Sequence, residues 1–169
     1  MATTAQSTTT TGLLRALRIG SALMALASLG FVGYAVIFFV RNFTGAFLEL
    51  GIGPAQVDVG RDEIRSFSND LYHYVSHLHI AASGFIAATG LATASLAWFG
   101  VRRGELWAYL TAVAAPVVGL AVALPAHYPW GLATVGHLGL IYLVTAVFIF
   151  GAVLALRPLL SLRSATDRP

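Results

Sequence analysis

Four long apolar stretches, separated by segments that carry most of the polar and charged residues, set the pattern of this chain. A helix rises about 1.5 Å per residue, so each stretch is long enough to cross a hydrocarbon core of about 30 Å. Backbone groups in lipid must be satisfied within their own element, so we expect an all-α integral membrane protein, most simply a four-transmembrane-helix up-down bundle. The predicted spans are about Ile19–Val40, Ile80–Gly100, Leu106–Leu124 and Leu138–Leu156.

The connections between the predicted spans are unequal in length. The first, residues 41–79, is much longer than the other two, and a connection of that length usually has structure or a function of its own. We expect a four-helix membrane domain of residues 19–158 that includes this long loop. The Thr-rich residues 1–18 are predicted to form a disordered tail, and residues 159–169 a second tail at the C-terminal end.

The composition agrees with this pattern and excludes several classes of function. Hydrophobic residues make up 57% of the chain and charged residues 10%, and the mean hydropathy is +0.79, all outside the range of soluble domains. Because no charged residue lies in the middle of a span, an ion-coupled carrier is disfavoured. No basic stripe with interleaved aromatic residues is present, so we expect no binding to nucleic acid. The absence of cysteine excludes disulfides and thiolate metal ligands.

The basic residues, all of them arginine, are distributed unequally about the predicted spans. Three lie in the 41–79 loop, where acidic residues outnumber them, and the other seven lie on the opposite side. Cytoplasmic segments of membrane proteins carry an excess of positive charge. We therefore expect a protein integral to the cytoplasmic membrane, with both termini cytoplasmic and the long loop outside. The seven arginines are Arg15, Arg18, Arg102, Arg103, Arg157, Arg163 and Arg168.

Small residues indicate how the predicted helices pack, because they let membrane helices approach closely. At 100° per residue, one face of the second span carries a stripe of small residues that continues from two histidines. We expect this face to point inward, against small residues of the third span at four-residue spacing. Such faces also suit contacts with other membrane subunits. The first stripe is His73, His77, Ala81, Gly84, Ala88, Leu91 and Ser95, and the second is Ala115, Gly119 and Ala123.

All five histidines fall at the outer end of the predicted bundle, where ionisable residues are candidates for a functional site. His73 and His77 are four residues apart, so their rings share one helical face at a spacing that two ligands of one metal ion can use. His127 and His137, which flank the turn before the last span, are the candidate remaining ligands. His79 projects from the opposite side of its helix and is expected to be an interface residue.

Asp70 lies in line with His73 and His77, but the axial separation of about 10 Å between Asp70 and His77 is too large for both to reach one ion. We therefore interpret Asp70 as a helix cap or a second-shell partner that orients His73. The candidate metals are copper, zinc and iron. His77 and His137 are also a candidate pair for haem b, since imidazole ligates haem iron from two sides.

Three hypotheses for function follow. The first is a membrane protein with an outer histidine-lined pocket that binds a metal ion or haem through His73, His77, His127 and His137. The second is a structural or assembly subunit of a larger membrane complex, in which the histidines are ordinary interface residues. The third is a membrane-embedded enzyme that acts on a lipid or a small apolar substrate, for which no catalytic residue can be assigned. A pH-sensing role for the histidines is a further alternative.

Overall fold

The computed structural model describes residues 2–166, with the side chains of residues 11–162 and 164. Within this part of the chain every element of regular secondary structure is a helix, and no strand is present. Four of the helices are long and apolar enough to cross a membrane, which confirms the prediction of four apolar spans. The helices are α1 (Ala2–Asn42), α2 (Arg61–Phe67), α3 (Asn69–Ser95), α4 (Leu106–His127) and α5 (Val135–Thr166), with a π-helical turn η1 (Leu96–Gly100) and a 3-10 turn η2 (Val101–Arg103) between α3 and α4.

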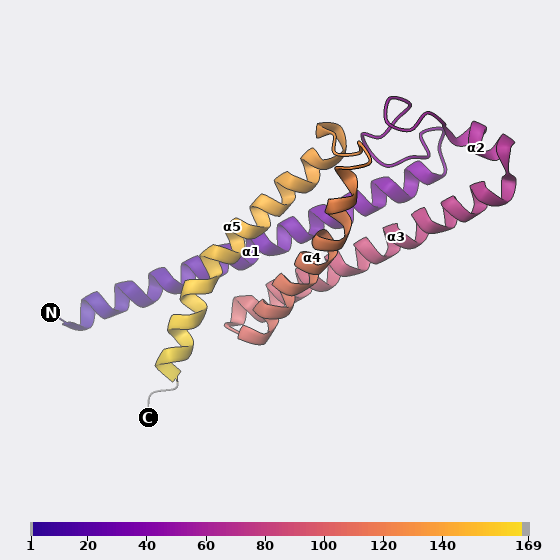
Figure 1. The fold of residues 1–169 in the computed structure, drawn as a ribbon. Helices are drawn as coiled ribbons and strands as arrows, with labels where there is room; N and C mark the ends of the chain where they lie inside the picture. Colours follow the sequence, from indigo (N-terminus) through magenta and orange to yellow (C-terminus); the bar gives the residue numbers. More distant parts are fainter. Residues whose placement is uncertain (1, 167–169) are drawn as a thin grey trace.

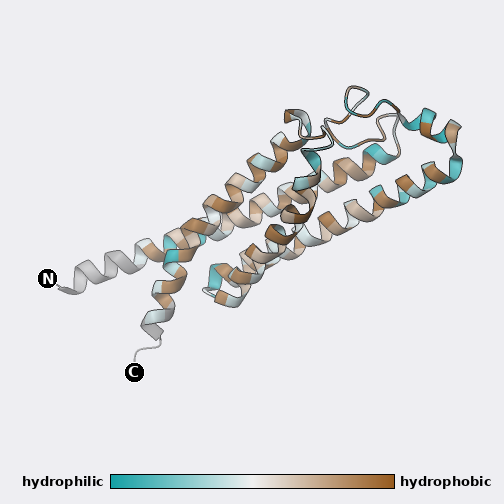
Figure 2. Cartoon of the chain, in the orientation of Figure 1, coloured by the Kyte–Doolittle hydropathy of each residue, from teal (hydrophilic) through white to brown (hydrophobic). Residues whose placement is uncertain are grey.

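The chain runs back and forth along one long axis (Figure 1). Helix α1 extends from the N-terminus to the end where the 43–60 segment and α2 lie, α3 returns, and α4 and α5 repeat the path. Helix α1 packs most extensively against α5 and α3, whereas α4 packs mainly against η1 and the adjoining part of α3. Hydrophobic residues cover most of the four long helices, and hydrophilic residues concentrate around α2 and the start of α3 (Figure 2).

Glycines set the closest approaches between the long helices. A Cβ atom built on Gly20 of α1 would lie 2.6 Å from the carbonyl oxygen of Gly151 in α5, and one on Gly151 would lie 2.7 Å from the carbonyl oxygen of Gly20. On the other side of α1, a Cβ on Gly90 of α3 would lie 2.9 Å from the carbonyl oxygen of Ser28. Close approach of this kind is how membrane helices gain packing energy without a hydrophobic driving force.

The helices extend beyond the predicted spans at several ends. Helix α3 begins at Asn69, well before Ile80, because Ser68 accepts a hydrogen bond from the Leu71 amide at 3.1 Å and caps it. The segment without helix is therefore 43–60, much shorter than the predicted loop 41–79.

Part of the predicted N-terminal tail is also helical. Thr11 to Arg18 continue α1, and Leu17 is only 2% exposed because it packs in the core. At the other end Leu159, in the predicted C-terminal tail, is 1% exposed. Residues 2–10 also belong to α1, but their side chains, like residue 1, lie outside the described part, and the predicted domain bounds stay predictions.

The predicted inward face of the second span is wrong. His73, His77 and Gly84 are exposed, and a Cβ atom on Gly84 would meet nothing within 4 Å. The packed face of α3 is the opposite one, which carries its own set of small residues. Its buried residues are Ser83, Gly90, Thr93 and Ala94. Helix α3 thus has small residues on two opposite faces, and contact with α1 decides which of the two is the inward face.

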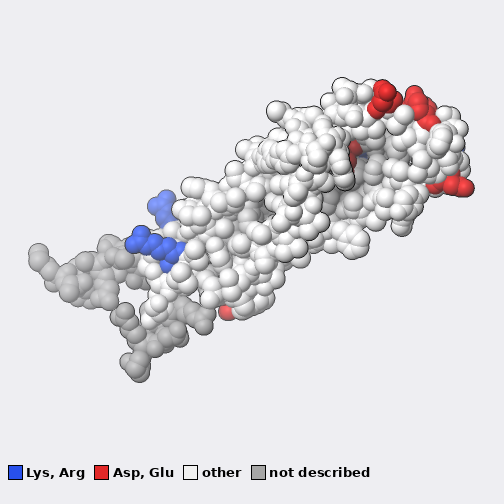
Figure 3. Space-filling view, viewed as in Figure 1, with Lys and Arg blue, Asp and Glu red and all other residues white. Residues whose placement is uncertain are grey.

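Charged residues lie at the two ends of the molecule (Figure 3). On the face shown, the basic side chains gather at the end that carries the chain termini, and most of the acidic side chains gather at the opposite end, around α2. The long helical surface between the two ends is nearly free of charge in this view, as expected for the part that crosses a membrane.

Candidate metal centre

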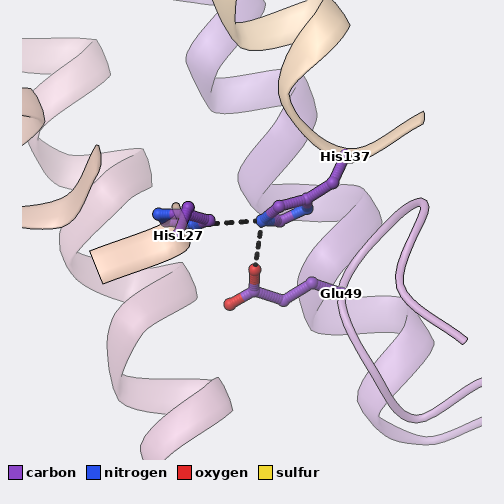
Figure 4. Close-up of side chains that lie close together, drawn as sticks. All are labelled: Glu49, His127 and His137. Atoms are coloured by element: carbon purple, nitrogen blue, oxygen red, sulfur yellow. Dashed lines mark hydrogen bonds and ion pairs between the residues drawn. The ribbon is translucent and has the colours of Figure 1, made fainter. Parts of the chain in front are cut away.

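Three side chains from distant parts of the chain converge at the end of the molecule that carries the 43–60 segment (Figure 4). The Nε2 atom of His137 lies 3.0 Å from Oε2 of Glu49 and 3.0 Å from Nε2 of His127. One potential ligand atom from each of the three residues lies within 4.8 Å of the other two. Glu49 comes from the 43–60 segment, His127 from the last turn of α4 and His137 from the first turn of α5.

His137 is fixed by the start of α5. The Thr134 hydroxyl accepts a hydrogen bond from the His137 amide at 3.1 Å, which caps the helix. The His137 side chain is 1% exposed, and its Nδ1 atom lies 2.9 Å from the carbonyl oxygen of Leu50. A ring so buried has little freedom to turn, so its Nε2 atom is aimed at Glu49 and His127.

His127 is the last residue of α4, and its Nδ1 atom lies 2.9 Å from the carbonyl oxygen of Ala123 in the preceding turn. The contact turns Nε2 of His127 toward His137, and the two rings are stacked with their centroids 5.0 Å apart.

The segment that carries Glu49 is held in two ways. The Arg41 guanidinium at the end of α1 donates to the carbonyl oxygens of Leu48 and Glu49, at 2.9 and 3.4 Å. Gly51 packs against Gly136 so closely that a Cβ atom on Gly51 would lie 2.1 Å from the Gly136 carbonyl carbon. Gly51 also has a φ of +76°, which favours glycine. These contacts bring Glu49 and the Leu50 carbonyl to His137.

The hydrogen bonds of the two rings determine where their protons are. A neutral imidazole has one N–H and one lone pair, and a backbone carbonyl oxygen can only accept. Both Nδ1 atoms face such an oxygen, so in neutral rings each Nδ1 carries the proton and each Nε2 presents a lone pair. Two lone pairs and an anionic carboxylate oxygen then converge. A proton on Nε2 of His137 can form a hydrogen bond with only one of its two neighbours at a time, Oε2 of Glu49 or Nε2 of His127. A metal ion at the same place would bind all three residues at once.

The carboxylate is ionised in this setting. Partial burial alone would raise the pKa of Glu49, but when the rings are protonated, a hydrogen bond donated by His137 and the positive charges of His137, His79 and His127 outweigh burial and lower the pKa below its usual 4.5. An ionised carboxylate is the form that ligates a metal.

The spacing of these atoms suits a small transition-metal ion. Ligand atoms about 2.0–2.1 Å from a tetrahedral zinc ion are separated from one another by about 3.3–3.4 Å. The two 3.0 Å contacts of His137 need to lengthen by only a few tenths of an ångström. The Glu49 side chain is 37% exposed and has room to turn toward His127. Both rings also have the Nδ1–H to carbonyl contact that commonly fixes metal-binding histidines.

Only part of the predicted ligand set comes together. His127 and His137 meet, whereas His73 and His77 lie exposed on the outward face of α3, outside this group. Asp70 is exposed in the first turn of α3, where Ser68 is the capping residue. His77 and His79 project from different sides of α3, as predicted. The side that points inward, however, is the one that carries His79.

His79 contacts the aromatic rings of Phe38 and Phe47, with centroid distances of 4.9 and 5.1 Å. Together with Glu49 and His127 it lines a hollow of about 340 Å³. Its Nδ1 atom is buried and has no hydrogen-bond partner in the described part of the chain.

Glu49 is the member of this cluster that the sequence analysis missed. It is the only acidic residue in the apolar stretch "FTGAFLELGIGPA", and an isolated carboxylate among apolar residues beside a membrane span is itself a signal of function. No match to this chain was found among protein-family models, curated proteins or solved structures.

Proposed function

We propose that this chain is an integral membrane protein that binds a divalent transition-metal ion through Glu49, His127 and His137. The observation that carries the proposal is the convergence of two Nε2 lone pairs and one carboxylate, with both Nδ1 protons directed to backbone carbonyls. Two imidazoles and one carboxylate suit zinc or iron(II), and the lack of a thiolate disfavours copper(I).

The proposal includes an orientation in the cytoplasmic membrane. The four long helices form an up-down bundle with both termini cytoplasmic, and the 43–60 segment and the metal ion lie at the outer face. Arg15, Arg18, Arg102, Arg103 and Arg157 support this orientation, since they belong to the end of the bundle opposite the site. The site is then accessible to metal from outside the cell.

Three protein ligands leave at least one coordination position of the ion free. Catalytic zinc sites share this feature, whereas structural zinc sites have four protein ligands. Glu49 and His127 line the 340 Å³ hollow, so the free positions of the ion face open space. This favours a site that binds a further ligand over one that only stabilises the fold. A haem held between His77 and His137 is not supported, because His77 lies on the exposed face of α3 and His137 Nε2 is already in contact with two other groups.

The test is the metal content of purified protein reconstituted in lipid nanodiscs. We expect one zinc or iron ion per chain in the wild type, with loss in His137→Ala and His127→Ala and weaker binding in Glu49→Gln. His77→Ala and His73→Ala are matched controls, because they remove histidines of the same protein outside the cluster, and both should keep the metal. A metal-free wild type after growth in metal-replete medium would instead identify the cluster as an ion pair between Glu49 and protonated His137.

A further inference from the structure

A second cavity, of about 310 Å³, lies between α1, α3, α4 and α5 and ends at the metal site. Apart from a few hydroxyl groups its walls are apolar, and His127 forms part of them. His127 and Ala123 line both this cavity and the hollow beside Glu49, so the two spaces adjoin at these residues. Residues that define the cavity include Phe31, Phe85, Ala115, Gly119, Leu120 and Phe148.

The cavity exists because the second half of α4 does not pack into the protein. The buried residues of α4 are Ala108, Tyr109 and Ala112, all in its first two turns. From Ala115 to His127 the helix presents small residues to the cavity, and a Cβ atom on Gly119 would meet nothing within 4 Å. This half of α4 is about 18 Å long. The hollow therefore extends deep along the spans.

The surroundings of the cavity indicate what fills it. It is formed by the four helices that cross the membrane, so the medium around it is hydrocarbon rather than water. Phe85, which lines it, is 75% exposed, so the hollow reaches the outer surface of the bundle beside α3. An apolar cavity does not hold ordered water and readily takes an apolar guest. Its volume is at the lower end of the range of small-molecule sites, which suits one chain rather than two.

Building on the proposed metal site, we infer that the cavity binds the hydrocarbon chain of a single-chain amphiphile whose anionic carboxylate-type head ligates the metal beside His127. A divalent ion held by two neutral imidazoles and one carboxylate keeps a net positive charge, which favours an anionic oxygen at the free position. The chain lies along α4 toward Ala115, and the head lies where the two hollows meet. The ligand class is thus a fatty acid taken from the bilayer.

The test uses protein loaded with Co²⁺ in nanodiscs, titrated with dodecanoate or with acetate and followed by the visible spectrum of the cobalt. Dodecanoate should perturb the spectrum of the wild type at a concentration roughly tenfold or more below that needed for Gly119→Phe, whose ring fills the cavity. Val118→Phe adds the same ring to a residue of α4 that is 64% exposed and outside the cavity, and it should behave as the wild type. Acetate, which has no chain, should act equally on all three proteins.

The outcomes separate the two proposals. If Co²⁺ does not bind at all, the proposed metal site is wrong and this inference falls with it. If Co²⁺ binds and Gly119→Phe leaves the dodecanoate titration unchanged, the metal site stands and the cavity assignment is wrong. Ala115→Leu is a second cavity-filling variant with less bulk, in case Gly119→Phe does not retain cobalt.

A photoreactive fatty acid with a diazirine at its chain terminus locates the chain directly. Its crosslinks should fall on the peptide around Ala115 and Pro116 and should disappear in Gly119→Phe. Crosslinks confined to lipid-facing positions would contradict the inference.

Discussion

The Nε2 atoms of His127 and His137 lie 3.0 Å apart although the Nδ1 atom of each ring faces a backbone carbonyl oxygen. Two neutral imidazoles in this arrangement would direct lone pairs at each other, which is unfavourable unless a proton on one Nε2 atom or a metal ion lies between them. The carboxylate of Glu49 adds a third electron-rich atom to the same point. The following predictions concern that arrangement and the packing that maintains it.

Metal should stabilise the folded protein through this cluster. A ligand that binds only the native state adds about 2.7 kcal/mol of stability at a free concentration one hundred times its dissociation constant. Zinc should therefore raise the midpoint of thermal unfolding of the nanodisc-embedded wild type, measured by circular dichroism. His137→Ala should show no such rise, while His77→Ala should respond as the wild type. An equal rise in all three proteins would mean that the zinc acts elsewhere.

Metal affinity should fall in acid with a slope set by the two histidines. Protons compete with metal for the ring nitrogens of histidine, so up to two protons bind as the metal leaves. The pKa of Glu49 is lowered below 4.5, so its carboxylate stays ionised at pH 5 and above and adds no third proton. The apparent affinity should fall as the pH is lowered, by about tenfold per pH unit for each ring that binds a proton. Titrations with a zinc indicator at several pH values measure this, and affinity that did not change between pH 8 and pH 5 would exclude histidine ligands.

Gly51 should be essential for the geometry of the site. Its φ of +76° is strained for any other residue, and a Cβ atom there would collide with the backbone of Gly136. Gly51→Ala should therefore displace Glu49 and the Leu50 carbonyl, cost about 1–3 kcal/mol of stability and weaken zinc binding. Gly53→Ala is the matched control, because a Cβ atom on Gly53 meets nothing within 4 Å. Calorimetric titration with zinc compares the two, and equal affinities would show that the segment is not held as described.

The packing of α3 on α1 gives a test that does not depend on the site. A Cβ atom on Gly90 would lie 2.8 Å from Val32 Cγ2 and 2.9 Å from the Ser28 carbonyl oxygen, whereas one on Gly84 meets nothing within 4 Å. Gly90→Leu should lower thermal stability by the cost of overpacking, about 1–3 kcal/mol or more. Gly84→Leu should have little effect. The reverse order would restore the His73 and His77 face as the inward one.

The proposed orientation can be tested by single-cysteine labelling, since the native chain has no cysteine. A membrane-impermeant maleimide added to intact cells should label cysteine at Gly60 or Trp130 and should not label cysteine at Gly104. Labelling at Gly104, with protection at the other two positions, would place the metal site on the cytoplasmic side.

The four spans could be predicted because hydropathy is a property of consecutive residues and needs no knowledge of neighbours. The inward face of α3 could not, because Gly84 and Gly90 belong to two small-residue stripes that are equivalent until α1 is in place. His127 and His137 could be predicted as candidate ligands beside His73 and His77, because they flank the turn at the same end of the bundle. Glu49 was not predicted, because it reaches His127 and His137 through Arg41, which holds its backbone, and through Gly51, which docks on Gly136.

The three ligands come from parts of the chain that leave the ribosome at very different times. Glu49 follows α1, whereas His127 belongs to α4 and His137 to α5, so the pair of Glu49 and His127 needs α4 and the complete set of three needs α5. In a chain without cysteine, the proposed metal ion would be a cross-link that closes fully only after α5 has been inserted. Acquisition of the ion would then mark the end of biogenesis, and a chain arrested before α5 would lack the His137 ligand.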